Sequence, residues 1–389
     1  MISSWHRELV CAGVFSLGLT ALVGIRPANS ENVSARAGSM LLLAKAEYSS
    51  PAFFFKRTRK GGDWLLQYRY KGSSDAWHDL ECTINDSASR RVDERYGVGG
   101  DLLAARFEAA IAEEGKKVFY YGKPRVLPVY NREKETWSLV PSWVEISDRV
   151  TIAEDRDKAI DEQRQFVDWY GRESGRIMNK VRDELLGKRG FLYTRTTGWA
   201  PAYSNLIVQS TAALQSCINV INQETEGSPE LLMNFFQSMK YVKVPAMEDG
   251  TGRMTGGFLL PATVMLKGEG DCDSKAAAFC AIQRTYPPRL VIFRSFQGAD
   301  AGGPRHALMG VETWATRPPH GQRQRETKES SHLPPWQTTS LDAIFYKDQV
   351  LIGLRYYTPC EVAGPGRLLF GQVSPGKEGS YVVIPIAPK

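Results

Sequence analysis

Short apolar and aromatic segments separated by Gly, Pro and Asn turns dominate residues 53–146, a pattern typical of β-strands. It predicts strands at 53–55, 64–70, 78–84, 117–121 and 143–146. One amphipathic helix lies among them at residues 102–114, where Leu103, Phe107 and Ile111 share a face. We therefore predict a β-rich amino-terminal domain over residues 49–149.

A helical pattern follows over residues 152–186. Apolar residues recur there at three-, four- and seven-residue steps, and Glu, Arg and Lys occupy most other positions. The apolar stripe consists of Ile160, Val167, Tyr170, Ile177, Val181 and Leu185. Gly171 and Gly175 are possible breaks. We predict a helical connector over 150–199 that packs between domains, since the heptad signal is too short for a coiled coil.

The third part of the chain, residues 200–389, mixes both patterns. Ser228, Pro229 and Glu230 mark a helix start, with Pro in the first turn. Strand-like apolar runs follow at 290–293, 306–311, 350–357 and 381–386. The expected fold class is therefore α+β.

The first 30 residues have the form of an export signal. Arg7 precedes an apolar run from Leu9 to Ile25, and Ala28-Asn29-Ser30 fits the small-x-small cleavage rule. An uncleaved membrane anchor is the alternative, because the run is near the lower length limit for a span. We predict a periplasmic or secreted protein whose mature chain starts with a flexible segment, residues 31–48.

Composition and charge indicate the class of protein and the kinds of partner to expect. The chain is 42% hydrophobic and 24% charged, which suits a globular protein with two domains. The net charge of +6 is spread along the chain, and no nucleic-acid-binding motif is present, so no nucleic-acid partner is expected. Five cysteines follow the leader, namely Cys82, Cys217, Cys272, Cys280 and Cys360. The odd number predicts at least one free thiol.

The candidate chemistry centres on residues 268–280. Gly268 and Gly270 free the backbone, Asp271 is suited to cap a helix, and Cys272 then falls at or next to its first position. A helix dipole favours a thiolate there, which makes Cys272 a candidate nucleophile. The alternative is a buried structural cysteine at the start of a core helix.

His306 is the candidate base. It begins an apolar run of strand length after a Gly-rich loop, 34 residues beyond Cys272. The other four histidines lie in the leader, beside Trp77, or in a polar, Pro-rich segment. A nucleophile and a base on different elements suit thiol catalysis.

Residues 270–276, Gly-Asp-Cys-Asp-Ser-Lys-Ala, together with His306-Ala307-Leu308, resemble the transglutaminase-like superfamily. Residues 232–241 and 260–268 also resemble its bacterial cysteine peptidases, and the similarity covers roughly residues 228–375. The resemblance implies a papain-like Cys-His-acid site, in which the cysteine helix packs on an antiparallel sheet. It favours hydrolysis of a protein or peptide substrate.

The acid of that site is less clear from the sequence. In the family it follows the histidine strand closely, whereas residues 316–340 are a polar insertion here. We predict Glu361, which ends the next strong strand and precedes a turn. Asp342 and Asp348 are the reserves, and Glu312 lies on the histidine strand itself. A carboxylate at Glu361 would orient the imidazole.

The predicted activity is that of a cysteine peptidase or amidase, with transamidation left open. Cys272 would attack a carboxamide, and its backbone N–H plus Gln237 or Tyr241 would hold the oxyanion. No cofactor is expected, and no metal, because Asp271 and Asp273 suit capping better than calcium binding. The alternative function is a non-catalytic binding or assembly module of the same fold.

Overall fold

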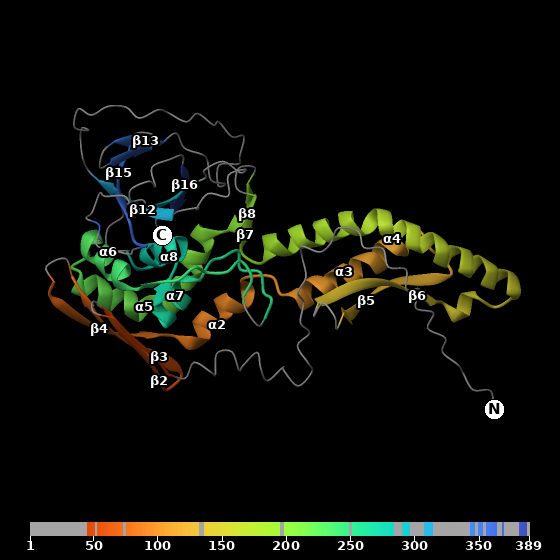
Figure 1. Cartoon of the computed structure of the whole chain (residues 1–389), viewed down its shortest axis with the longest axis horizontal. Helices are drawn as coiled ribbons and strands as arrows, with labels where there is room; N and C mark the ends of the chain where they lie inside the picture. The colour runs from red at the N-terminus through yellow and green to blue at the C-terminus, as the bar shows by residue number, and fades with distance from the viewer. Residues whose placement is uncertain are drawn as a thin grey trace. The chain divides into compact units, whose positions relative to one another are not determined.

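The computed structural model describes residues 45–50, 53–72, 75–131, 136–194, 198–248, 251–283, 290–295, 307–313, 343–346, 349–352, 355–363, 368 and 381–386. The fold is a mixture of helices and small antiparallel sheets, which confirms the predicted α+β class at that level (Figure 1). The predicted export signal at 1–30, the polar insertion at 316–340 and most of the segment 31–48 lie outside these residues. The described end of that segment belongs to strand β1 (Lys45–Ser50), which pairs with β2 (Phe53–Lys60).

The described chain divides into two compact units. One contains residues 98–189 and 247–254, and the other contains residues 33–97, 190–246 and 255–389. These boundaries differ from those predicted at 149/150 and 199/200. The amino-terminal strands belong to the second unit because their apolar side chains pack on its helices, where Tyr68 contacts Phe235 edge to face at 5.2 Å.

The first unit is built from one long helix and a two-stranded sheet. Its elements are α3 (Gly100–Gly115), β5 (Gly122–Asn131), β6 (Thr136–Glu145), the 3₁₀ turn η2 (Ser147–Arg149) and α4 (Ala153–Lys188). Phe119 is central to its core, since Trp143, Phe166 and Trp169 all meet its ring edge to face. The predicted strand at 117–121 is instead a turn, whose Tyr120 and Tyr121 amides donate to the Glu162 carboxylate.

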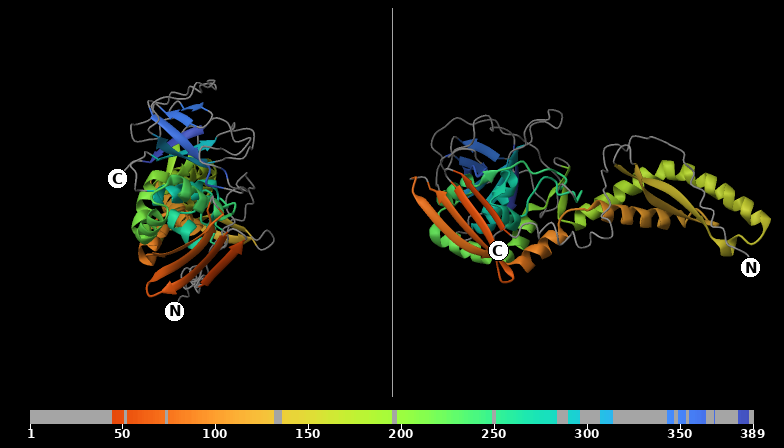
Figure 2. Two further views of the ribbon diagram at one scale, coloured as in Figure 1. Left: turned by 90° about the vertical axis from the view of Figure 1, so that its left-hand side faces the viewer. Right: turned by 60° about the horizontal axis from the view of Figure 1, so that its bottom comes forward.

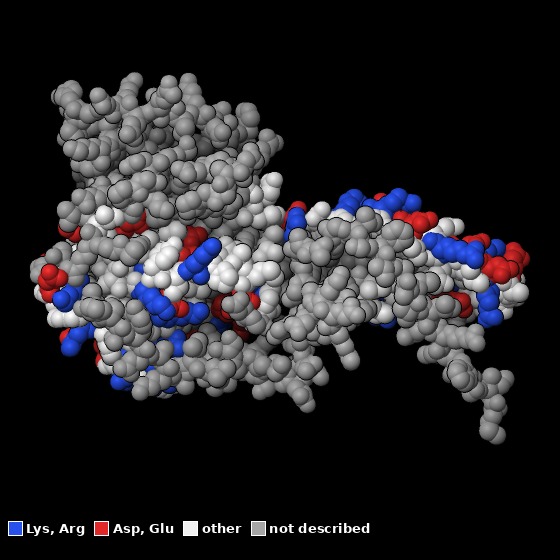
Figure 3. Space-filling model, in the orientation of Figure 1, with Lys and Arg blue, Asp and Glu red and all other residues white. Residues whose placement is uncertain are grey.

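Helix α4 corrects the predicted connector in two ways. It runs for 36 residues without a break at Gly171 or Gly175. The predicted stripe is buried in the second half of the helix, at Ile177, Val181 and Leu185. It is displaced in the first half, where Ile160 and Val167 are 42% and 43% exposed and Phe166 and Trp169 are buried instead. Positive and negative side chains are interspersed on the surface of α4 (Figure 3). Some of them form ion pairs along the helix, such as Lys158 with Glu154 and Arg176 with Glu173.

The second unit holds two large sheets with helices between them. Strands β1 to β4 are antiparallel in sequence order, with β2 at Phe53–Lys60, β3 at Asp63–Lys71 and β4 at Trp77–Ile84 (Figure 2). The helices are α2 (Asp86–Arg95), α5 (Tyr203–Glu224), α6 (Pro229–Ser238), α7 (Pro261–Lys267) and α8 (Cys272–Ile282). The Ser228 cap and Pro229 start α6 as predicted. Two hairpin strands, β7 (Phe191–Thr194) and β8 (Gly198–Pro201), precede α5.

The other large sheet of this unit has six antiparallel strands in the order β13-β14-β15-β12-β11-β16. Their bounds are β11 Leu290–Ser295, β12 Ala307–Thr313, β13 Ala343–Tyr346, β14 Gln349–Ile352, β15 Arg355–Cys360 and β16 Tyr381–Ile386. The four predicted strands are present, with the run at 350–357 divided between β14 and β15. Helix α8 contacts β11 and β12 of this sheet and α5, α6 and α7 of the helical layer, so it lies at the centre of the unit.

A disulfide between Cys82 and Cys217 joins β4 to α5 and spans 135 residues of chain. Cys272, Cys280 and Cys360 are free and buried. The pairing was one of several that the sequence allowed. It fixes the amino-terminal sheet to the helix that packs on α8.

Replacing both Cys82 and Cys217 by Ser should lower the free energy of unfolding of the second unit by about 2–5 kcal/mol, because the cross-link closes a long loop. Urea unfolding with and without dithiothreitol measures the effect. The reductant should lower the stability of the wild-type protein and leave that of the double variant unchanged. Equal wild-type stability in both conditions would contradict the cross-link.

Gly268 ends α7 in the left-handed conformation, with φ of +63°, and a Cβ there would lie 2.8 Å from the Phe55 ring. Gly268→Ala should therefore cost about 2–4 kcal/mol of stability, from backbone strain and from overpacking. Gly198 is the matched control, because its φ is +64° and no described atom lies within 4 Å of its Cβ position. Gly198→Ala should cost only about 1–2 kcal/mol. Equal losses in urea unfolding would rule out the Phe55 contact.

Candidate functional site

Cys272 is the first residue of α8, as predicted. Asp271 caps the helix: its backbone is extended, and its Oδ1 accepts the Ser274 N–H at 3.2 Å. The two residues before it form β10 (Glu269–Gly270), which pairs in parallel with β9 (Lys240–Tyr241). The thiol therefore lies where a tight turn after α7 delivers the chain into a central helix.

The Cys272 sulfur accepts a hydrogen bond from the backbone N–H of Ala307, the first residue of β12. His306, the predicted base, precedes Ala307 in the chain and lies outside the described residues. Strand β12 pairs with β15 in a register that places Met309 opposite Cys360. The start of β12 and the end of β15 therefore share one edge of the sheet, beside the start of α8.

Glu361 follows β15 directly at this edge and is only 1% exposed. Its Oε1 accepts the Ala363 N–H at 3.1 Å, and its backbone carbonyl accepts from Gln237 Nε2 at 2.6 Å. These bonds fix a tight turn around a buried carboxyl group. Asp342 and Asp348, the reserve acids, lie outside the described residues. Glu312 is on β12, with its backbone paired to Tyr357.

The two predicted oxyanion donors have different surroundings. Gln237 is buried, and its Nε2 donates to the carbonyls of Glu361 and Leu368, at 2.6 Å and 3.2 Å. The Gln237 amide group is therefore engaged with two backbone carbonyls, one of them in the turn of Glu361. Tyr241 is 46% exposed on β9. Partial burial, then the nearby Cys272 and carboxyl groups, raise the Tyr241 pKa to about 12, so its hydroxyl remains a donor.

A pair of carboxyl groups flanks the thiol. Asp271 and Asp273 are hydrogen-bonded to each other, and Asp273 Oδ2 also accepts from the Tyr203 hydroxyl at 2.6 Å. Burial and the charge of Asp273 raise the Asp271 pKa to about 8, so Asp271 retains its proton at neutral pH. Tyr203 was absent from the sequence prediction, because 70 residues separate it from Asp273.

The described surroundings of Cys272 favour the neutral thiol. Burial, and then the charges of Asp273 and Asp271, raise the Cys272 pKa to about 12, although the Ala307 N–H acts in the opposite direction. The expected preference of a helix N-terminus for a thiolate is therefore outweighed by desolvation and two carboxyl groups. A reactive thiolate here requires a base or a cation in addition to the helix.

Lys275 is a second residue of this cluster, besides Tyr203, that the sequence pattern did not predict. It lies in the first turn of α8 and is 0% exposed. Its Nζ donates to the carbonyls of Met239 at 2.7 Å and Ala363 at 3.1 Å. The signal in the sequence was a lone lysine directly before the apolar run at 276–282.

The described residues contain no group of three or more His, Cys, Asp or Glu side chains suited to holding a metal ion. They also include no helix that is both long and apolar enough to cross a membrane.

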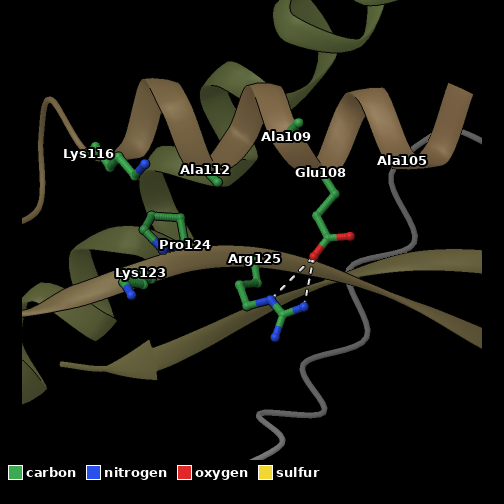
Figure 4. Close-up of a pocket in the computed structure, with 8 residues that line it drawn as sticks. All are labelled: Ala105, Glu108, Ala109, Ala112, Lys116, Lys123, Pro124 and Arg125. Atoms are coloured by element: carbon green, nitrogen blue, oxygen red, sulfur yellow. Dashed lines mark hydrogen bonds and ion pairs between the residues drawn. The ribbon is translucent and has the colours of Figure 1, made fainter. Parts of the chain in front are cut away.

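An open groove between α3 and β5 in the first unit is lined by small and basic residues, among which Arg125 pairs with Glu108 at 3.0 Å (Figure 4). None of the predicted site residues lines it.

No family model, curated protein or solved structure matches the chain.

Asp273→Asn should lower the Cys272 pKa, because it removes the larger of the two charges that raise it. Asparagine still accepts from Tyr203, so the helix start is retained. Below the thiol pKa, the rate of Cys272 alkylation by iodoacetamide at fixed pH should rise about three- to tenfold. Glu230→Gln, in the first turn of α6, is the control for an exposed carboxylate. An unchanged rate in Asp273→Asn would refute the electrostatic assignment.

Proposed function

We propose that the protein is an exported thiol enzyme of transglutaminase-like type, acting on a protein or peptide carboxamide through a Cys272 acyl-enzyme. One observation carries the proposal. The Cys272 sulfur at the start of α8 accepts from the Ala307 N–H at the start of β12, and Glu361 directly follows β15, the strand paired with β12. A helix-terminal cysteine facing adjacent strand ends resembles the Cys-His-acid arrangement of that superfamily.

In this proposal His306 is the base. The described surroundings keep the thiol neutral, so the proton has to be removed as the sulfur attacks, or the thiolate has to be paired with an imidazolium. His306 is one residue from the N–H that contacts the sulfur. Glu361 is the acid that orients the imidazole and stabilises its charged form.

The reaction then follows from ordinary acyl-transfer chemistry. The sulfur attacks the carbonyl carbon, the C–N bond breaks, and the leaving amine takes the proton from His306. The Cys272 backbone N–H has no acceptor within its own helix, so it is suited to hold the oxyanion together with the Tyr241 hydroxyl. Water then releases the thioester as an acid, or an amine releases it as a new amide.

Two features support an extracytoplasmic location. The Cys82–Cys217 disulfide suits an oxidising compartment, and residues 1–30 have the composition of an export signal. The proposed location is the periplasm or the exterior, with an amino-terminal membrane anchor as the alternative. The proposed partner is a protein or peptide substrate.

A non-catalytic binding or assembly module is the second candidate. The observation that favours it is the Cys272 pKa, which burial and the Asp273 and Asp271 charges raise to about 12. A thiol held neutral in this way is a structural side chain. The two candidates therefore differ in whether His306 changes the reactivity of Cys272.

The deciding experiment is the pH profile of Cys272 alkylation by iodoacetamide in the purified protein, followed on the Cys272 peptide by mass spectrometry. A thiol enzyme should react with a midpoint well below the ordinary thiol value of about 8.5. His306→Ala should then slow the reaction at pH 7 by about tenfold or more, and Glu361→Gln should slow it less.

Cys272→Ser provides the blank for the two buried thiols, Cys280 and Cys360. A midpoint above about 8.5 that is the same in the wild-type protein and in His306→Ala would exclude the thiol enzyme and support the binding module.

A further inference from the structure

Lys275 joins two segments that lie on either side of Cys272. One of its acceptors, the Met239 carbonyl, directly precedes β9, the strand that carries Tyr241. The other, the Ala363 carbonyl, belongs to the turn of Glu361, where the Ala363 N–H in turn donates to Glu361 Oε1. One ammonium group therefore connects the helix of the nucleophile to both the acid turn and the oxyanion candidate.

Burying a lysine at this position is energetically unfavourable, so packing alone does not explain it. It is fully buried in the first turn of a helix, where the macrodipole disfavours a cation. Burial lowers the Lys275 pKa to about 7, and the charges of Glu361, Asp271 and Cys272 partly oppose that effect. An apolar residue of the same length would fill the space without this desolvation cost.

The groups that face Lys275 come from each element around it. Glu361 follows β15, Asp271 and Cys272 belong to the start of α8, and the ring centroid of Tyr241 on β9 lies 6.0 Å from Nζ. Most of these groups gain from a nearby positive charge when they ionise. The charges of Glu361, Asp271 and Cys272 all act on the Lys275 ammonium group.

We propose that Lys275 is a positioning residue of the Cys272 site: it holds the Glu361 turn and the Tyr241 strand at fixed places beside the thiol, and its charge, when present, favours the ionised forms of Glu361 and Cys272. This inference deepens the proposed function and rests on it. The ammonium does not touch the reacting carbonyl in this role. It acts through Glu361 and through the electrostatic potential at the sulfur.

The test uses Lys275→Met, which keeps the length of the side chain and removes the charge and the donors. The pH profile of Cys272 alkylation should shift upwards, and the rate at pH 7 should fall about tenfold or more. Glu361→Gln should then add less than about twofold in the Lys275→Met background, because the acid turn has already lost its anchor. Lys267→Met, at an exposed position at the end of α7, is the control and should match the wild-type protein.

Lys275→Gln serves as a second variant, since it retains N–H donors and lacks the charge, and it decides the question if Lys275→Met does not fold. A folded Lys275 variant with reduced thermal stability but the wild-type pH profile would overturn the inference, because a purely structural lysine predicts that result. Failure of the proposed function would look different. His306→Ala would then leave the profile unchanged, whereas Lys275→Met would still raise the midpoint.

Discussion

The structure of the second unit depends on the complete burial of α8. All eleven residues of this helix are buried, including Cys272, Asp273, Ser274 and Lys275 in its first turn. A helix N-terminus leaves backbone N–H groups without intrahelical acceptors, so a buried start needs partners from elsewhere. Asp271 and Asp273 accept the Ser274 N–H, and the Ser274 hydroxyl accepts from Leu259. The polar cluster around the thiol therefore follows from placing a helix start inside the core.

The same burial sets the electrostatics of the cluster. Desolvation is the largest cause of the raised pKa values of Asp271 and Cys272 and of the lowered value of Lys275. Each shift favours the neutral form, as expected when water is excluded. The groups also act on one another: the charge of Asp273 raises the pKa values of both Asp271 and Cys272. Perturbed ionisable groups gathered at a helix start are typical of functional sites, although buried ion-pair networks show them too.

Much of this arrangement could be read from the sequence where local chemistry decides. The Gly268 turn, the Asp271 cap and the helix from Cys272 follow from short-range rules, and so does the Ser228 start of α6. Tertiary packing decided the rest. The buried stripe of α4 follows the aromatic cluster around Phe119, which an apolar period alone does not reveal. The roles of Gln237 and Lys275 depend on carbonyls more than 30 residues away in the chain.

The placement of Gln237 and Lys275 shows how the fold makes the end of β15 rigid. Gln237 comes from α6 and donates to the Glu361 carbonyl, whereas Lys275 comes from α8 and donates to the Ala363 carbonyl. Two helices thus bind the same three-residue turn from different directions, and the Glu361 side chain closes it through the Ala363 N–H. A surface loop does not need hydrogen bonds from buried side chains, since water satisfies its backbone groups. These three contacts together fix the place of the Glu361 carboxyl group next to the first turn of α8.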